Sequence, residues 1–301
     1  METIGFIGPG KIGLPICANL IKSGYRVLGY RRGTLAEFEK IGGVAAHSPA
    51  DIATEADIVF SCLPSSEALA DVVNGERGLL KSAHQGQIIV ELGSYAVPDK
   101  EQYVAPFAQK GAVFLDGEVS GTPGMVAARK AVIYLAGDKE ACSVAQRVIA
   151  GFSDECLYFG PFGAASRVKL VNNLLVAIHI AATAEAMALG LKAGVDVDLM
   201  IKAIADGSGG STQFRTRAPW MAARRFVPAQ GTAAALQHYF DLIGGFADSM
   251  GVATPMLDRA AGLYDKFMDM GFAELDVAAM VDTVAALPRS KSCPQLRSKE
   301  E

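Results

Sequence analysis

Short apolar runs recur through the first half of the chain, each bounded by glycine, proline or polar residues. Runs of this length predict buried strands, and they lie at residues 3–7, 25–30, 57–63, 87–92, 113–116, 131–135 and 155–159. Segments with helical spacing separate most of these runs. Strands that alternate with helices are typical of a parallel sheet covered on both faces, so we predict a doubly wound α/β domain.

The pattern changes at Gly163, after which no convincing strand appears. Residues 164–193 predict one helix about 45 Å long at 1.5 Å per residue, and its middle is apolar nearly all round. We expect a second subunit to cover part of such a helix. The predicted domains are therefore 1–163, which holds the sheet, and 164–287, which is all-helical and joined to it by the long helix. The polar tail at 288–301 is predicted to be disordered.

A glycine-rich turn follows the first strand, with GxGxxG spacing at Gly8, Gly10 and Gly13. Gly8 would form the tight turn, Gly10 would let the backbone approach a pyrophosphate, and Gly13 would let the next helix pack closely on the strand. Glycine pairs also occur in ordinary turns, but the strand before this motif and the helix and strand after it favour a Rossmann dinucleotide site. The predicted cofactor-binding residues of the turn are Gly8, Pro9, Gly10, Lys11, Ile12 and Gly13.

The end of the second strand indicates which dinucleotide binds. A NAD site usually carries Asp or Glu there for the ribose hydroxyls, whereas the 2′-phosphate of NADP favours arginine. This chain has Arg31 and Arg32 followed by Gly33 and Thr34, with no acid. Two guanidinium groups can bind a phosphate dianion, so we predict NADP (NADPH) in preference to NAD. The alternative is a pair of solvated arginines on a loop.

Other strand ends supply further candidates, because ligands of doubly wound sheets bind at the carboxyl ends of the strands. Leu63, Pro64 and Ser65 lie at the end of one strand and Ser94 follows another, so we predict that all four neighbour the cofactor. Ser120 and Gly121 follow the strand at 113–116. Their hydroxyl and N–H groups can hold a carboxylate or carbonyl oxygen, although a polar turn between strands has the same composition.

Lys169 and Asn173 lie near the start of the long helix, four residues apart, so they share a helix face and can meet one ligand. An ammonium group flanked by Val168 and Leu170 can serve as a general acid and then as a base. A single lysine on a helix is more often a surface residue. Asparagines need partners when they are buried, so Asn172 and Asn173 beside the lysine favour a functional site.

Composition argues against several other classes of protein. A net charge of −4 provides no basic face for nucleic acid, and no run approaches the ~20 uncharged apolar residues of a membrane span. The four histidines show no ligand spacing, so we predict no metal site. The five scattered cysteines and an N-terminus that opens directly into a strand indicate reduced thiols and a cytoplasmic location.

Three segments resemble the beta-hydroxyacid dehydrogenase family, and the resemblance spans nearly the whole chain. This family includes 3-hydroxyisobutyrate dehydrogenase and the tartronate, glyoxylate and succinic semialdehyde reductases, with 6-phosphogluconate dehydrogenase as a relative. GFIGPGKIGLPICANLIKSGYRV resembles its cofactor motif, DGEVSGTPG its substrate motif and KLVNN its catalytic helix.

The resemblance implies a role for each of these segments. Lys169 would be the proton donor or acceptor, Asn173 would support the substrate, and Ser120 and Gly121 would bind its acid group. Ser94 would contact the nicotinamide. Arg32 matches the arginine of the reductases that prefer NADPH.

Three departures qualify the resemblance. Phe240 stands where the family has a lysine that approaches the nicotinamide, and Asp241 follows it. The resemblance therefore counts Phe240 among the expected cofactor-binding residues. Glu118 replaces the usual proline before Val119, adding a negative charge that would disfavour a dianionic substrate. The segment LDGEVSGTPGMVAARKAVIYLAG also resembles the NADPH-dependent imine reductases, which share the fold but generally lack the helix lysine.

We therefore expect an NADP(H)-dependent oxidoreductase that acts on a small 3-hydroxy acid or its semialdehyde, with Lys169 as general acid and base. The alternatives are an imine reductase on the same fold and a non-catalytic NADP-binding protein, the latter motivated by Phe240. The expected partners are a small-molecule substrate and a second copy of the chain, in a homodimer or homotetramer.

Overall fold

The structure, a computed structural model, describes residues 1–288 and divides into two compact units. The first unit comprises Met1–Asn173 with Leu242–Val252, and the second comprises Leu174–Asp241 with the chain from Ala253 onward. The long helix contributes to both units, so the predicted domain boundary after residue 163 stays a prediction. Residues 289–301, most of the tail predicted to be disordered, lie outside the described residues.

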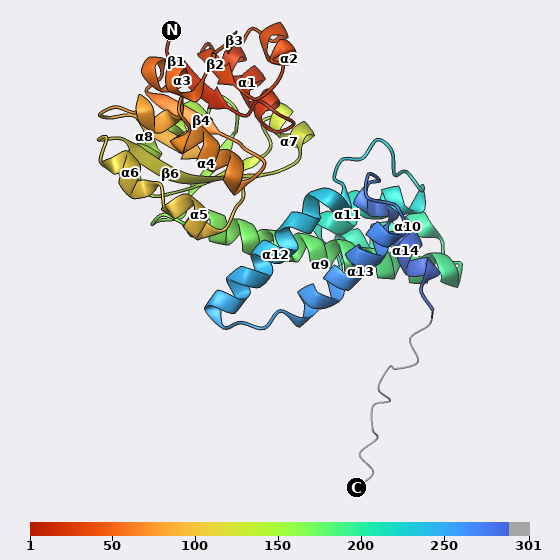
Figure 1. Ribbon diagram of the computed structural model, residues 1–301. Helices are drawn as coiled ribbons and strands as arrows, with labels where there is room; N and C mark the ends of the chain where they lie inside the picture. Colours follow the sequence, from red (N-terminus) through yellow and green to blue (C-terminus); the bar gives the residue numbers. More distant parts are fainter. Residues whose placement is uncertain (289–301) are drawn as a thin grey trace. The chain divides into compact units, whose positions relative to one another are not determined.

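An eight-stranded sheet forms the centre of the first unit, in the order β3-β2-β1-β4-β5-β6-β7-β8. Figure 1 shows this sheet among the helices of the unit. Its strands are β1 (Thr3–Ile7), β2 (Arg26–Tyr30), β3 (Val44–Ala45), β4 (Ile58–Ser61), β5 (Ile88–Glu91), β6 (Val113–Ser120), β7 (Val132–Ala136) and β8 (Glu155–Tyr158). All neighbouring pairs are parallel except β6 and β7. The strand order runs outward in both directions from β1 and β4, and ligands of such sheets bind at this switch point. The predicted fold class is confirmed.

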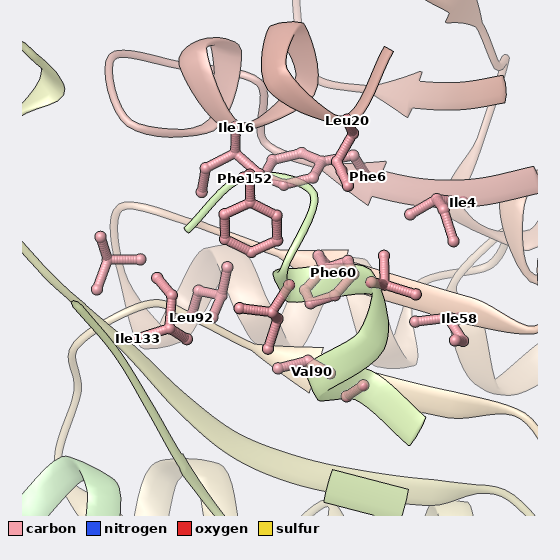
Figure 2. Packing of buried hydrophobic residues seen from close by; sticks show 14 of the residues in the cluster. Ile4, Phe6, Ile16, Leu20, Ile58, Phe60, Val90, Leu92, Ile133 and Phe152 are labelled. Atoms are coloured by element: carbon pink, nitrogen blue, oxygen red, sulfur yellow. The ribbon is translucent and has the colours of Figure 1, made fainter. Parts of the chain in front are cut away.

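Helices cover both faces of the sheet, because successive side chains on a strand point to opposite sides. Ile4 and Phe6 of β1 pack in a core with Ile16 and Leu20 of the first helix, as Figure 2 shows. Ile7 points the other way, into a second core. The first core includes α1 (Gly13–Lys22) and α8 (Lys139–Ile149), and the second includes α3 (Pro49–Glu55), α4 (Ser66–Asn74) and α6 (Val104–Ala108). The shorter elements of this unit are α2 (Ala36–Lys40), α5 (Val97–Glu101), α7 (Pro123–Ala127) and the 3-10 turn η1 (Leu79–Lys81).

Two strands differ from the prediction. β6 continues to Ser120, where the sequence predicts a loop from Gly117 onward, because its last residues pair with β7 in an antiparallel ladder that ends at Ser120↔Val132. The sequence pattern also does not indicate β3, since two residues carry no measurable periodicity. The longer β6 carries the predicted substrate motif on a strand rather than on a loop.

Serine caps fix the starts of two helices. Ser48 Oγ accepts a hydrogen bond from the Asp51 N–H at 3.2 Å, with Pro49 at the first helical position. Ser65 Oγ accepts one from the Ala68 N–H at 3.3 Å. Both starts agree with the sequence pattern of a capping residue at the end of a turn.

The long helix α9 (Ala164–Ala193) has the predicted bounds, and one stripe of it is buried, including Lys169, Asn173, Ala177 and Ala184. By length and composition α9 could also cross a membrane, so the expectation that no segment comes near a span is wrong on those criteria. A helix in the core of a folded domain passes the same test, and 39% of the apolar window of α9 is buried.

The second unit is helical, as predicted. Its elements after α9 are α10 (Val197–Asp206), α11 (Thr212–Ala222), α12 (Ala233–Met250), α13 (Pro255–Asp269), η2 (Val277–Ala279) and α14 (Met280–Ala286), with the last part of α12 in the first unit. A buried ion pair joins Arg217 to Asp276 at 2.7 Å, and Asp276 also accepts a hydrogen bond from the Gln230 N–H at 2.8 Å. This carboxylate holds the loop before α12 to the turn before η2.

Candidate active site

The glycine turn between β1 and α1 has the steric requirements that the motif predicts. Gly8 has φ +85°, and a Cβ there would lie 2.3 Å from the Cys62 carbonyl oxygen. A Cβ on Gly13 would lie 2.4 Å from the Gly8 carbonyl oxygen and 2.6 Å from the Phe6 ring. At Gly10 the nearest atom would be 3.9 Å away. The fold itself therefore requires Gly8 and Gly13, whereas Gly10 leaves open space beside the backbone, as a bound pyrophosphate needs.

A cavity of about 640 Å³ opens beside this turn, at the switch point of the sheet. Nine of the predicted cofactor-binding residues line it: Gly8, Gly10, Lys11, Ile12, Gly13, Arg31, Arg32, Leu63 and Pro64. Pro9 lies in the wall of a second cavity of about 400 Å³, which shares Gly10, Lys11 and Arg31 with the first. The volume and the lining match those of a cofactor site.

The two arginines after β2 occupy different positions. Arg31 donates a hydrogen bond of 3.4 Å from its guanidinium to the Pro9 carbonyl oxygen, beside the glycine turn. Arg32 lies 3.5 Å from the carboxylate of Asp71 on α4, and both side chains are exposed. Asp71 also lines the cavity, and sequence reasoning missed it because it lies far along the chain from the arginines.

Lys169 is buried against the predicted substrate motif. Its ammonium donates a hydrogen bond of 2.7 Å to the Val119 carbonyl oxygen, one residue before Ser120. Lys169 is 7% exposed and Asn173, one helical turn later, is 5% exposed; the Oδ1 of Asn173 accepts a hydrogen bond from Asn172 at 3.2 Å. The structure thus brings Lys169 to the end of β6, directly before Ser120 and Gly121 and within the first unit, and Asn173 follows one turn later on the same helix.

A buried group of charges lies next to this lysine, and the sequence analysis did not identify it. Lys100 on α5 donates to Asp116 Oδ1 at 3.0 Å, to the Gly117 carbonyl at 3.0 Å and to Glu118 Oε1 at 3.1 Å. Lys100, Asp116 and Glu118 are each at most 1% exposed. Burial works against the charged form of Lys100, but the carboxylates around it outweigh this effect and raise its pKa.

Ser94 and Ser166 connect this group to neighbouring elements. Ser94 Oγ donates a hydrogen bond of 2.5 Å to Glu118 Oε2. Ser166, at the start of α9, donates through its backbone N–H to Asp116 at 2.9 Å and through its hydroxyl to the same carboxylate at 2.6 Å. Burial raises the pKa of Glu118, and the charges of Lys100 and Lys169 act in the opposite direction. The start of α9 is therefore held to β6 at the point where Lys169 meets Val119.

Glu91 links this group to the cavity. It is fully buried at the end of β5, where it accepts hydrogen bonds from the Ser61 hydroxyl and from the Gly93 N–H at 2.6 Å. Tyr95 lies 3.3 Å from Glu91 and donates a hydrogen bond of 2.9 Å to the carbonyl oxygen of Leu63, which lines the cavity. Burial raises the pKa of Glu91 to about 7.

Comparison with known families identifies the family of this chain. The model for the NAD binding domain of 6-phosphogluconate dehydrogenase matches residues 3–160, more than half of the chain, and the model described as NAD-binding of NADP-dependent 3-hydroxyisobutyrate dehydrogenase matches residues 163–284. The chain belongs to the beta-hydroxyacid dehydrogenase family. As a member of this family, it carries NAD(P)-binding domains and belongs among the NAD(P)-dependent hydroxyacid dehydrogenases.

Individual family members show the extent of the similarity. Rat mitochondrial 3-hydroxyisobutyrate dehydrogenase is 34% identical over 208 residues, which are 68% of this chain and 62% of that enzyme. The NAD-dependent L-serine dehydrogenase of Pseudomonas aeruginosa is 30% identical over 93% of this chain and 97% of its own length. The structure of Mycobacterium tuberculosis 3-hydroxyisobutyrate dehydrogenase with L-serine superposes with a TM-score of 0.84 at 26% identity, covering 95% of this chain and 100% of that chain.

Imine reductases share the fold of this family. Their structures have TM-scores of 0.60 to 0.64 against this chain, at 15% to 17% identity. These TM-scores establish a common fold, and identity this low does not indicate whether the chemistry is shared.

The two residues that depart from the family pattern lie in different units. Phe240 is on α12 in the second unit, where its ring centroid lies 5.0 Å from that of Tyr264. Glu118 is in the first unit, and its negative charge faces Lys100. The expectation that Glu118 repels a dianionic substrate did not take account of this buried lysine, which offsets the charge.

Proposed function

We propose that this family member catalyses hydride transfer between NADP(H) and a small 3-hydroxy acid or its semialdehyde, with Lys169 as general acid and base. The observation that carries the proposal is the buried ammonium of Lys169, 2.7 Å from the Val119 carbonyl and next to Ser120. The burial of this ammonium at the predicted substrate motif supports a role in exchanging a proton with a bound oxygen. A lysine with a purely solvated role would extend into water.

The residues around the cavity fit a dinucleotide. The open space at Gly10 and the N–H groups at the start of α1 would take the pyrophosphate, and Arg31 and Arg32 would take a 2′-phosphate. The nicotinamide of bound NADPH supplies the hydride. The family includes members named for each cofactor, so the two arginines and the lack of an acid directly after β2 are the support for NADP.

The side chains of the chain itself then handle the proton and the acid group. During reduction Lys169 would donate a proton to the substrate oxygen, and during oxidation it would accept that proton. The Ser120 hydroxyl and the N–H groups at Gly121 would hold the carboxylate, and Asn173 would support the substrate from the next turn of α9. The relatives are named for L-serine and 3-hydroxyisobutyrate, and each of these compounds carries a hydroxyl group on the third carbon of a carboxylic acid.

A cofactor and substrate panel tests the proposal. Purified protein is assayed at the NADPH absorbance band, with NADPH or NADH for a series of short semialdehydes and one cyclic imine, and with NADP⁺ or NAD⁺ for the corresponding 3-hydroxy acids. We expect turnover with a semialdehyde and a higher kcat/KM with NADPH than with NADH. Turnover of the imine alone would identify an imine reductase. NADPH binding without any turnover would identify a non-catalytic binding protein.

We also propose that the chain acts in the cytoplasm as a homodimer or homotetramer and that it binds neither nucleic acid nor membranes. Several apolar side chains of α9 are exposed in the single chain, among them Val171 at 53%, Leu175 at 47% and Leu189 at 73%. Apolar side chains exposed along one helix are typical of a surface that a partner subunit covers.

A further inference from the structure

His47 follows β3 at the edge of the sheet and lines the larger cavity. β3 runs parallel to β2, with Gly29 opposite Ala45, and the Ala46 N–H donates to the Gly29 carbonyl oxygen at 2.8 Å. Two residues beyond the Gly29–Ala45 pair come Arg31 and His47, and both line the cavity. Adjacent strands lie ~4.8 Å apart, and residues two positions along a strand point to the same face. The register therefore places His47 beside Arg31 in the wall of the cavity.

The wall around His47 carries charges of both signs, and two of its arginines have carboxylate partners. Arg32 lies 3.5 Å from Asp71, and Arg77 lies 3.1 Å from Asp51 on α3. These ion pairs cancel part of the positive charge that an anionic ligand would meet, so a further cation in the wall would strengthen its attraction. The other titratable side chains that line the cavity are Lys11, Tyr30, Arg31, Arg32, Cys62, Asp71, Glu76 and Arg77.

Asp51 is an acid within electrostatic reach of His47. Desolvation acts to raise the pKa of Asp51, but hydrogen bonds and the charges of Arg77 and His47 lower it. Both oxygens of this carboxylate lie 3.1 Å from the Arg77 guanidinium, which holds it on the outer side of the cavity wall. His47 is exposed, so its imidazole is accessible to a ligand in the cavity.

A histidine adds a positive charge to such a wall only in slightly acidic solution. An imidazole ordinarily titrates near ~6.5, between the pH values at which other side chains ordinarily change charge. An imidazolium N–H makes a charge-assisted hydrogen bond to a phosphate oxygen, which is roughly twice as strong as a neutral hydrogen bond. Because NADP⁺ and NAD⁺ differ only in the 2′-phosphate, a bond of this kind would distinguish the two cofactors.

We propose that His47 is a specificity-determining residue that, when protonated, binds the 2′-phosphate of NADP(H) beside Arg31. This inference rests on the proposed NADP(H) function. Arg31 and Arg32 keep their charge at every working pH, so they set a constant preference for NADP(H). His47 adds to this preference as the pH falls toward ~6. The chain therefore discriminates against NAD(H) more strongly in slightly acidic solution than the two arginines alone would allow.

Calorimetric titration with NADP⁺ and with NAD⁺ tests the inference without any turnover. The measured preference is the Kd of NAD⁺ divided by the Kd of NADP⁺, at about pH 6 and at about pH 8.5. We expect His47→Gln to lower the preference about fivefold at the lower pH, the upper end of the range for an exposed ion pair, and less than about twofold at the higher pH. The Kd of NAD⁺ should stay within about twofold of wild type at both. Each variant is compared with wild type at the same pH, because the phosphate itself titrates near ~6.

Two further variants test the charge and the position. His47→Lys keeps a positive charge at both pH values, so its preference should match wild type within about twofold at the lower pH and exceed it about fivefold at the higher pH. His84→Gln changes a histidine after η1 that lines neither cavity, and it should keep the wild-type preference. Thermal melting checks that each variant is folded, as we expect for substitutions of the exposed His47. If His47→Gln is unfolded, His47→Lys decides.

The outcomes separate the inference from the proposed function. An unchanged preference in His47→Gln at the lower pH would overturn the inference, and so would a loss of equal size at both pH values. Equal weakening of NADP⁺ and NAD⁺ would also overturn it, because an imidazole that contacts the adenosine, or only holds the loop before α3, acts on both cofactors. Wild-type protein that binds NADP⁺ no more tightly than NAD⁺ at either pH would overturn the proposed NADP(H) function, and the inference with it.

Discussion

Glu91 is a carboxyl group whose charge state depends on the fold. Burial raises its pKa to about 7, although Lys100, the Ser61 hydroxyl and the Gly93 N–H favour the charged form. A glutamate in an unfolded chain titrates near ~4.3. The pKa of Glu91 is higher in the folded protein than in the unfolded chain, so the folded protein binds the proton more tightly. Protonation of Glu91 therefore stabilises the fold. This contribution is fully present below the unfolded pKa and is lost as the pH rises through about 7.

Replacing Glu91 with glutamine should remove this pH dependence, because the amide imitates the protonated carboxyl. For the wild type, we expect Glu91 to lower the free energy of unfolding by up to about 3 kcal/mol between pH 5 and pH 8, at 1.36 kcal/mol per pKa unit. Urea titrations at several pH values measure this change in the free energy of unfolding. Glu155→Gln serves as the exposed control. A Glu91→Gln protein with the wild-type slope would show that the carboxyl is charged throughout.

Asp71 should reduce the preference for NADPH, because its carboxylate faces Arg32 across the cavity at 3.5 Å. Asp71→Asn removes a negative charge near the predicted 2′-phosphate. We expect NADPH to bind about two- to fivefold more tightly and NADH to be unaffected, a small effect because exposed ion pairs are worth about 0.2–1 kcal/mol. Titrations with NADPH and with NADH measure the two affinities, and Glu67→Gln on the same helix is the control. Equal changes for NADPH and NADH would argue against a 2′-phosphate at Arg32.

At the scale of elements, Lys100 joins α5 to β6 through three buried hydrogen bonds. Lys100→Met leaves two buried carboxylates without their cation, which should reduce the free energy of unfolding by about 3–5 kcal/mol. Chemical denaturation measures the loss, and Lys110→Met, an exposed lysine after α6, should cost little. Adding Glu118→Gln should recover part of the stability. A loss below about 1 kcal/mol would mean that water or a rearranged side chain replaces the lysine.

The elements also show how far sequence reasoning reaches. Strand and helix order, the glycine turn and α9 follow from local spacing, and the structure agrees with them. The end of β6 does not follow from local spacing, because a glycine such as Gly117 is typical of a loop. This segment is a strand only because it pairs with β7. Lys100 and Glu118 are 18 residues apart and meet only in the folded state, so no local pattern indicates their contact. Long-range pairing of this kind is what single-sequence reasoning lacks.

At the scale of the whole molecule, the exposed apolar side chains of α9 predict self-association. Leu175→Glu would place a charge among them, so we expect the wild type to be a dimer or tetramer and the variant to shift toward monomer. Light scattering coupled to size-exclusion chromatography measures the mass. Lys192→Glu, at the exposed end of the same helix, is the control for a charge change elsewhere on α9. A monomeric wild type would contradict the prediction.

Chemical rescue of Lys169→Ala tests the central claim most directly, because it asks whether an amine at this position exchanges the proton. Turnover of a semialdehyde with NADPH should fall by about 10²–10⁴-fold while NADPH affinity stays close to wild type, and Lys192→Ala should have no effect. Added methylamine should restore turnover in proportion to its concentration. Wild-type turnover in Lys169→Ala would contradict the account, and so would a loss of turnover that no small amine restores.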